Sequence, residues 1–143
     1  MSEAREISDR LTELINTHDA QAIGDLFAED GVLVDPSGEF RGRAAIVEYW
    51  EGFFRAFPSM SGADTFSAES GDTAINEWTA SGAHEGPLDG PEGTIEPTGK
   101  TVTIRGADAI TVRDGKITSQ RVYYDQLAFM IQLGLVPEPA AAS

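Results

Sequence analysis

The hydrophobic periodicity of this sequence changes at Pro58, and that change restricts the possible folds more than any other feature. Before Pro58, apolar residues recur mostly at helical spacing, whereas after it apolar and polar residues alternate as they do in strands. Helices followed by a run of strands predict an α+β fold built on an antiparallel sheet, rather than a doubly wound parallel sheet.

The part before Pro58 is expected to form three helices and one short strand. The spacing predicts helices over residues 3–17 and 43–57, and between them a short helix that Asp19 caps and that includes Leu26 and Phe27. Gly31 ends this short helix, and an apolar strand follows over residues 32–35. The third helix carries a mainly aromatic stripe, which favours packing against a sheet; its members are Ile46, Tyr49, Trp50, Phe53, Phe54 and Phe57.

The part after Pro58 is expected to form four long strands, over residues 63–70, 73–84, 100–113 and 116–125. Asp114 and Gly115 form a strong hairpin signal between the last two strands. Residues 86–93 are predicted to be a loop, because their prolines and glycines oppose a regular strand. A single domain over residues 1–135 and a flexible tail over residues 136–143 follow from this reading.

Charge and composition exclude several classes of function. The 143 residues include 24 acidic and 10 basic side chains, for a net charge of −14, which disfavours nucleic acid and membrane partners. The excess of acid favours a neutral or cationic small molecule. Cysteine is absent, which excludes disulfides and thiolate chemistry. Without an apolar leader or a membrane-length apolar stretch, we expect a cytoplasmic protein.

Two strand residues draw attention because of the faces they occupy. Alternation along residues 103–112 places Asp108 on the same face as Ile104 and Ile110, so burial should raise the pKa of its carboxyl. If that face were inverted, Asp108 would lie in solvent. His84 follows Trp78 in a similar alternation and could line the same cavity, although a satisfied or exposed histidine at a strand end is the alternative.

Aromatic side chains could wall an apolar pocket, the alternative being a filled core; these are Trp50, Phe53, Phe54, Phe57, Trp78 and Phe129. No spacing of histidines and carboxylates suggests a metal site, and no glycine-rich phosphate motif occurs. We therefore expect neither a metal nor a cofactor.

Several short strings, in this order and spacing, resemble the nuclear transport factor 2-like superfamily. Within it the chain resembles the steroid delta-isomerase and SnoaL-like polyketide cyclase branches over nearly its whole length. The strings are LFAEDG at 26–31, DPSG at 35–38, GRAAI at 42–46, RDGKI at 113–117, YYD at 123–125 and QLG at 132–134. The resemblance implies a cone of three helices packed on a strongly curved antiparallel sheet, with a short C-terminal helix.

The isomerase resemblance also implies roles for two aspartates. Asp35, in the Asp-Pro-x-Gly string, matches the general base that moves a proton between carbons. An aspartate before proline also commonly begins a turn. Asp108 falls where the isomerases place the acid that stabilises an enolate oxygen. The expected substrate-binding residues are Trp50, Phe54, Trp78, His84, Tyr124 and Asp125.

The sequence departs from each enzyme pattern at one or more positions. Leu11 replaces the first-helix tyrosine of the isomerases, whose loss typically costs about 10²–10³ in rate; candidates to replace it are Tyr49, Tyr123 and Tyr124. Val122 stands where the cyclases carry an acid/base aspartate. Asp125 matches one acid of the limonene epoxide hydrolase-like enzymes, but Thr101 and Thr103 replace their arginine and second aspartate.

We therefore expect a cofactor-independent acid/base enzyme, of isomerase type, acting on a hydrophobic carbonyl compound. The alternatives are a module of the same fold that only binds a small lipophile, or a cyclase-type or epoxide hydrolase-type relative. A curved sheet covered by helices on one face leaves its outer face bare, so we also expect a homodimer through the sheet.

Overall fold

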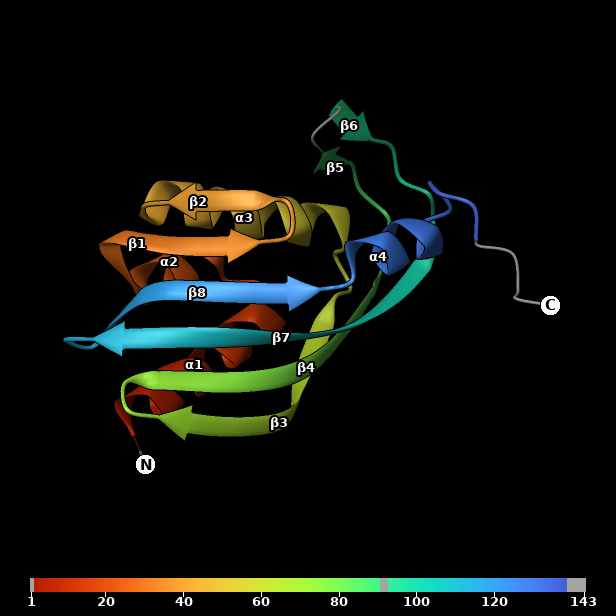
Figure 1. Ribbon diagram of the computed structural model, residues 1–143. Coiled ribbons are helices and arrows are strands. Elements are labelled where there is room, and N and C mark those ends of the chain that lie inside the picture. Colours follow the sequence, from red (N-terminus) through yellow and green to blue (C-terminus); the bar gives the residue numbers. More distant parts are fainter. Residues whose placement is uncertain (1, 91–92, 139–143) are drawn as a thin grey trace.

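The chain folds as a curved sheet that carries its helices on one face, as the computed structural model of residues 2–90 and 93–138 shows (Figure 1). The helices are α1 (Glu3–Asn16), α2 (Ala20–Asp25), α3 (Arg43–Ala56) and α4 (Gln126–Gln132). The strands are β1 (Phe27–Asp35), β2 (Gly38–Arg41), β3 (Ser61–Ser70), β4 (Thr73–Ala83), β5 (Leu88–Gly90), β6 (Gly93–Ile95), β7 (Thr101–Arg113) and β8 (Lys116–Tyr124).

Six strands form the main sheet in the order β2-β1-β8-β7-β4-β3. Neighbouring strands are antiparallel except for β1 and β8, which run parallel. Figure 1 shows α1, α2 and α3 behind this sheet, with α4 and the β5–β6 hairpin at one end. The predicted α+β architecture, with three helices on a curved sheet and a short C-terminal helix, is confirmed.

Local sequence explains where several elements begin and turn. Ser2 caps α1 by accepting a hydrogen bond from the Arg5 amide, and Asp19 caps α2 in the same way through Ala22. The predicted β7–β8 hairpin turns at Asp114 and Gly115, whose φ angles of 53° and 77° are those of a tight primed turn.

The prediction for the second helix was wrong at its C-terminal end. α2 stops at Asp25, and Phe27 already belongs to β1, where it pairs with Ile117 of β8. The Ile117 amide donates to the Leu26 carbonyl over 2.8 Å, which draws this backbone into the sheet. A register shift between Phe27 and Val32 then absorbs the extra residues, so β1 combines apolar positions that sequence spacing had divided between a helix and a strand.

The prediction of an irregular loop over residues 86–93 was also wrong. A short antiparallel hairpin forms between Leu88–Gly90 and Gly93–Ile95. Pro87, which has no backbone N–H to donate, lies before β5 and therefore does not interrupt the pairing. The short strand β2 was missed as well; it pairs with β1 immediately after the turn at residues 36–37. Residues 139–143 of the predicted tail lie outside the described residues.

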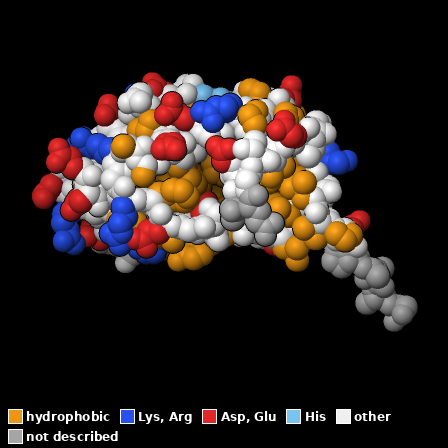
Figure 2. Space-filling model, turned by 90° about the horizontal axis from the view of Figure 1, so that it is seen from above, with side chains coloured by type: hydrophobic (Ala, Val, Ile, Leu, Met, Phe, Trp, Pro, Cys, Tyr) orange, Lys and Arg blue, Asp and Glu red, His pale blue; other side chains and the backbone are white. Residues whose placement is uncertain are grey.

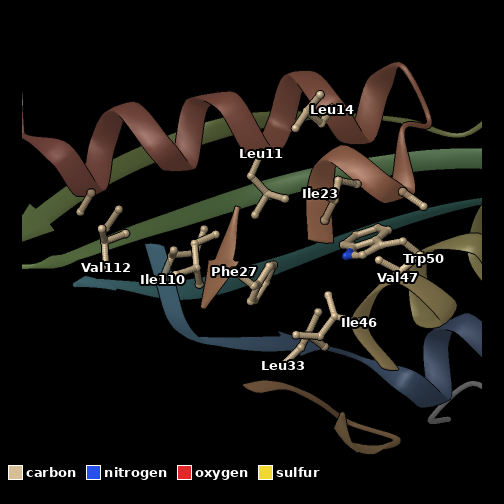
Figure 3. Packing of buried hydrophobic residues seen from close by; sticks show 14 residues of the cluster. Leu11, Leu14, Ile23, Phe27, Leu33, Ile46, Val47, Trp50, Ile110 and Val112 are labelled. Atoms are coloured by element: carbon tan, nitrogen blue, oxygen red, sulfur yellow. The ribbon is translucent and has the colours of Figure 1, made fainter. Parts of the chain in front are cut away.

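The core lies between the helices and the concave face of the sheet, and Figure 3 shows its larger cluster. Ile23, Phe27, Leu33 and Ile46 are fully buried there, and burying each such side chain contributes about 1.5–3 kcal/mol. A second cluster forms around Phe57 at the end near α4. Within the described residues, no helix has both the length and the apolar character needed to cross a bilayer.

Candidate active site

A cavity of about 150 Å³ lies between the concave face of the sheet and helices α1 and α3. Its walls come from both hydrophobic clusters, and it is open to solvent on one side. Figure 2 views the molecule from the side of β2, α4 and the β5–β6 hairpin and shows a hollow with a largely hydrophobic lining and acidic side chains around it. Aromatic side chains dominate the cavity wall; they are Tyr49, Trp50, Phe53, Phe57, Trp78, Tyr124 and Phe129.

Trp78 forms the part of this wall that belongs to the sheet. Its ring lies over Gly106 of the neighbouring strand, where an added Cβ would come within 2.4 Å of the ring, so only glycine leaves room for the indole. Of the predicted binding residues, Trp50, Trp78 and Tyr124 line the cavity. Phe54 is not among the lining residues; it stacks on His18 with 4.4 Å between ring centres.

Asp108 lines the cavity from the middle of β7 and is 8% exposed, on the face that alternation predicts. Its Oδ1 accepts a hydrogen bond from Asn76 Nδ2, and its Oδ2 accepts one from Gln120 Nε2, each over 2.9 Å. Burial raises the pKa of Asp108 in the predicted direction, while these two hydrogen bonds oppose the rise. Asp108 is therefore a desolvated acid supported by two side-chain amides.

A buried polar network links Asp108 to the first helix. Arg5 Nη2 donates to Ser8 Oγ over 3.0 Å and to Asn76 Oδ1 over 2.8 Å. Asp64 of β3 lies 3.9 Å from the same guanidinium, lines the cavity and has a pKa raised by burial. One cation thus lies near a half-buried carboxyl, Asp64, and a buried one, Asp108, at one side of an otherwise apolar cavity.

Asp35 ends β1 and is 6% exposed, but it is not among the residues that line the cavity. Its Oδ1 accepts from the Ser37 amide, the Ser37 hydroxyl and the Gly38 amide, the turn expected of an aspartate before proline. Its Oδ2 accepts from the Tyr49 hydroxyl over 2.9 Å. Tyr49 does line the cavity, so the phenol stands between Asp35 and any molecule bound there.

The three tyrosines considered as replacements for the missing helix tyrosine occupy different places. Tyr49 already donates its proton to Asp35, and burial raises its pKa well above the ordinary value. Tyr124 lines the cavity, and its pKa is raised by burial and by the nearby charge of Asp35. Tyr123 is 60% exposed on the opposite face of β8, so it was wrongly included. Leu11, at the replaced position, is buried and lines the cavity.

Two further predicted binding residues lie outside the cavity lining. His84 is fully buried and packs against Phe57, and its Nδ1 accepts a hydrogen bond from the Thr98 amide over 3.1 Å. Burial lowers the pKa of His84, so this histidine anchors the loop near the hairpin in its neutral form. Asp125 caps α4 by accepting from the Ala128 amide.

The structure also locates the residues that align with the cyclase and epoxide hydrolase patterns. Val122, at the cyclase position, lines the cavity between Asp108 and β1. Thr101 and Thr103, at the epoxide hydrolase positions, are exposed. Among the described residues, no three histidines, cysteines or carboxylates gather closely enough to hold a metal ion.

Sequence reasoning missed four polar residues of the site: Arg5, Asp64, Asn76 and Gln120. A signal existed for two of them, because Asn76 lies two residues before Trp78 and Gln120 lies two before Val122 on inward strand faces. A polar residue on an otherwise apolar strand face indicates a candidate site, as the position of Asp108 does.

Comparisons with known proteins agree with this architecture. Structural neighbours include AclR from Streptomyces galilaeus, a candidate hydroxylase, with 21% identity, a TM-score of 0.82, and coverage of 98% of this chain and 86% of that one. A candidate SnoaL-like polyketide cyclase from a Jannaschia species has 19% identity, a TM-score of 0.82, and 94% coverage of each chain. A Catenulispora acidiphila protein with a ketosteroid isomerase-like fold, in complex with trimethylamine, has 24% identity, a TM-score of 0.76, and coverage of 92% and 94%.

Comparison of the sequence with curated proteins gives no significant match. The SnoaL-like domain family, in contrast, matches residues 9–120, which include the second half of α1, all of α3, the first half of β8 and both Asp35 and Asp108. The structural neighbours have the same fold, and the match extends over most of the chain. The chain is therefore a member of the SnoaL-like domain family.

Proposed function

We propose that this protein is a cofactor-independent acid/base enzyme that moves a proton on a small hydrophobic carbonyl compound. One observation carries the proposal: two buried carboxyls, in different surroundings, lie on the same concave face beside an apolar cavity. Leu33 of β1 pairs with Gln120 of β8, so the next inward position of β1, Asp35, comes level with Val122, which pairs with Asp108. Two strand spacings separate these aspartates, about 10 Å between backbones.

The base in this proposal is Asp35 acting through Tyr49. The Tyr49 oxygen takes a proton from a substrate carbon while its own proton passes to Asp35 Oδ2, across the hydrogen bond already formed. The reverse transfer returns a proton to another carbon of the same molecule. Ser37 and Gly38 hold the other carboxylate oxygen, which keeps Oδ2 directed at the phenol.

Asp108 supplies the electrophilic side of the reaction. Removal of a carbon-bound proton next to a carbonyl places negative charge on the carbonyl oxygen. A buried acid that holds its proton stabilises that charge better than water does, either directly or through the Gln120 amide bonded to it, because both groups are already oriented and desolvated. Burial raises the pKa of Asp108, which is the direction that such an acid requires.

The size of the cavity limits the substrate that fits inside it. A cavity of about 150 Å³ accommodates a single six-membered ring. The aromatic walls favour a flat, apolar ring, and larger substrates would extend through the open side. Cyclohex-2-enone is therefore the first compound to test.

A second candidate, a module that binds a lipophile without turnover, is favoured by one specific observation. Every oxygen of Asp35 and Asp108 already accepts a hydrogen bond from the protein, as purely structural carboxylates do.

Deuterium exchange separates the two candidates. Cyclohex-2-enone in heavy water is followed by NMR with wild type, Asp35→Asn, Tyr49→Phe and Asp30→Asn, the last an exposed aspartate on the same strand as a matched control. Wild type and Asp30→Asn should accelerate exchange next to the carbonyl, and the other two variants should lose on the order of 10²-fold. Saturable binding without accelerated exchange would favour the binding module. Exchange by Asp35→Asn at the wild-type rate would refute the base assignment.

A further inference from the structure

Gln120 carries an unsatisfied polar atom at the cavity. Its side chain is 2% exposed and lines the cavity, and its Oε1 has no hydrogen-bond partner among the described residues. We propose that Gln120 is the side chain that contacts the polar group of the ligand, and that the protonation of Asp108 determines whether Gln120 presents an acceptor or a donor to it. This inference rests on the proposed function, because it concerns the ligand of the same cavity.

The hydrogen-bond partners of Asn76 determine how its side-chain amide is oriented. Arg5 can only donate hydrogen bonds, so the atom of Asn76 that faces its guanidinium must be the oxygen. The Asn76 amino group therefore faces Ser8 and Asp108, where it donates to Asp108 Oδ1 over 2.9 Å. Asp108 Oδ1 thus accepts a hydrogen bond in either protonation state.

In this proposal the proton of Asp108 resides on Oδ2, the oxygen that faces Gln120, because Oδ1 already accepts from Asn76. When Asp108 is ionised, Gln120 donates its amino group to Oδ2 and leaves Oε1 directed elsewhere. When the proton on Oδ2 points at Gln120, two donors would face each other, so the Gln120 amide rotates and its Oε1 accepts. The free amino group of Gln120 then takes the place of the free oxygen.

The charged groups around Asp108 act on its pKa in opposite directions. Arg5 of α1 favours the ionised form, and Asp64 of β3 opposes it, while burial raises the pKa of Asp108. The partners from the other neighbouring strands, Asn76 of β4 and Gln120 of β8, are neutral amides. The charge of Asp64 therefore raises the pKa of Asp108, whereas no other charged group lies on the inward face of the Asp108 strand itself.

The two states select ligands of different chemistry. An ionised Asp108 leaves an acceptor, which suits a ligand with an N–H or O–H group. A protonated Asp108 leaves a donor, which suits a carbonyl or an enolate oxygen. Trp50, another lining residue, carries a buried indole N–H that has no partner within the described chain, and this donor is the same at every pH.

Three compounds of one shape test this selection: indene, which has no polar group; indole, which only donates; and 1-indanone, which only accepts. Their affinities for the purified protein are measured by calorimetry from about pH 5 to about pH 8, where folded proteins are most stable. In wild type, the preference for 1-indanone over indole should rise by about tenfold as the pH falls, the value of one buried hydrogen bond. Indene binding should stay constant.

Asp108→Asn should fix the donor state, because an asparagine can accept from Asn76 and donate to Gln120 Oε1 at every pH. Its preference for 1-indanone should therefore be high and independent of pH. Gln120→Leu should weaken 1-indanone and indole about tenfold relative to indene and remove the pH dependence. Gln21→Leu, an exposed position on α2, is the matched control. If Gln120→Leu does not fold, Asp108→Asn alone decides the question.

The inference is overturned if Gln120→Leu changes all three affinities equally. It is also overturned if wild type and Asp108→Asn show the same preference at every pH. Failure of indene, indole and 1-indanone to bind would overturn the inference; if the exchange of cyclohex-2-enone is not accelerated either, the proposed function is refuted with it. Opposite pH profiles for indole and 1-indanone, without accelerated exchange of cyclohex-2-enone, would leave the inference standing and remove the enzymatic function.

Discussion

Arg5→Met should destabilise the protein strongly, and more so at higher pH. Arg5 is 9% exposed and is the cation of the buried network around Asp64 and Asp108. Removing one partner of a buried ionic group costs about 3–5 kcal/mol. We expect about 3 kcal/mol, the lower end, because Asp9, the closest ion-pair partner, is half exposed and regains water.

The pH dependence of this loss follows from the sign of the interaction. Arg5 lowers the pKa of both Asp64 and Asp108, so without it both folded-state pKa values rise further above their unfolded values. An acid with a raised folded-state pKa contributes stability that is lost as the pH climbs from the unfolded to the folded value. The free-energy loss in Arg5→Met should therefore be larger at about pH 8 than at about pH 5.

Urea unfolding at the two pH values measures this loss. Arg10→Met is the matched control, because Arg10 lies on the same helix in an exposed pair with Glu13, and its loss should change stability by less than about 1 kcal/mol. A total stability of about 5–15 kcal/mol leaves Arg5→Met folded enough to measure. An Arg5→Met loss equal to that of Arg10→Met, or no larger at high pH than at low pH, would refute the reasoning.

Three other outcomes are expected. Asp108→Asn should keep or raise the urea midpoint near neutral pH, because a raised pKa means that ionised Asp108 costs stability above its unfolded value; a clear fall would contradict this. Gly106→Ala should destabilise by about 1–3 kcal/mol and change the fluorescence of Trp78, since the new Cβ would meet the Trp78 ring at 2.4 Å and the Tyr123 carbonyl oxygen at 2.6 Å; unchanged stability would argue against this packing. The outer face of the sheet exposes Phe66 and Tyr123, so sedimentation should show a dimer that the substitution Tyr123→Lys weakens. A wild-type monomer at micromolar concentration would exclude the dimer.

Strand periodicity was enough to place the acid and part of the aromatic wall. Asp108 shares its face with Ile104 and Ile110, and a period of two residues tolerates no other arrangement once that face is buried. The same reasoning placed Trp78 correctly but failed for His84, because β4 ends at Ala83 and alternation no longer applies beyond it.

Contacts between distant elements could not be predicted from local patterns. The Asp35–Tyr49 hydrogen bond joins a strand end to a helix, and the Arg5–Asn76 bond joins residues 71 positions apart. Each depends on how the elements pack, which periodicity does not encode. The β1–β8 pairing is of the same kind: the Ile117 amide of β8 donates to the Leu26 carbonyl, a contact that helical spacing does not indicate.

A structure of the protein with bound 1-indanone tests the central claim most directly, because it locates the ligand carbonyl relative to both polar sides of the cavity. We expect the rings to lie against Trp78, the carbonyl oxygen to lie within hydrogen-bond distance of the Gln120 amide beside Asp108, and the neighbouring carbon to face the Tyr49 oxygen. A ligand bound outside the cavity, or one whose carbonyl contacts neither Gln120 nor Asp108, would contradict it.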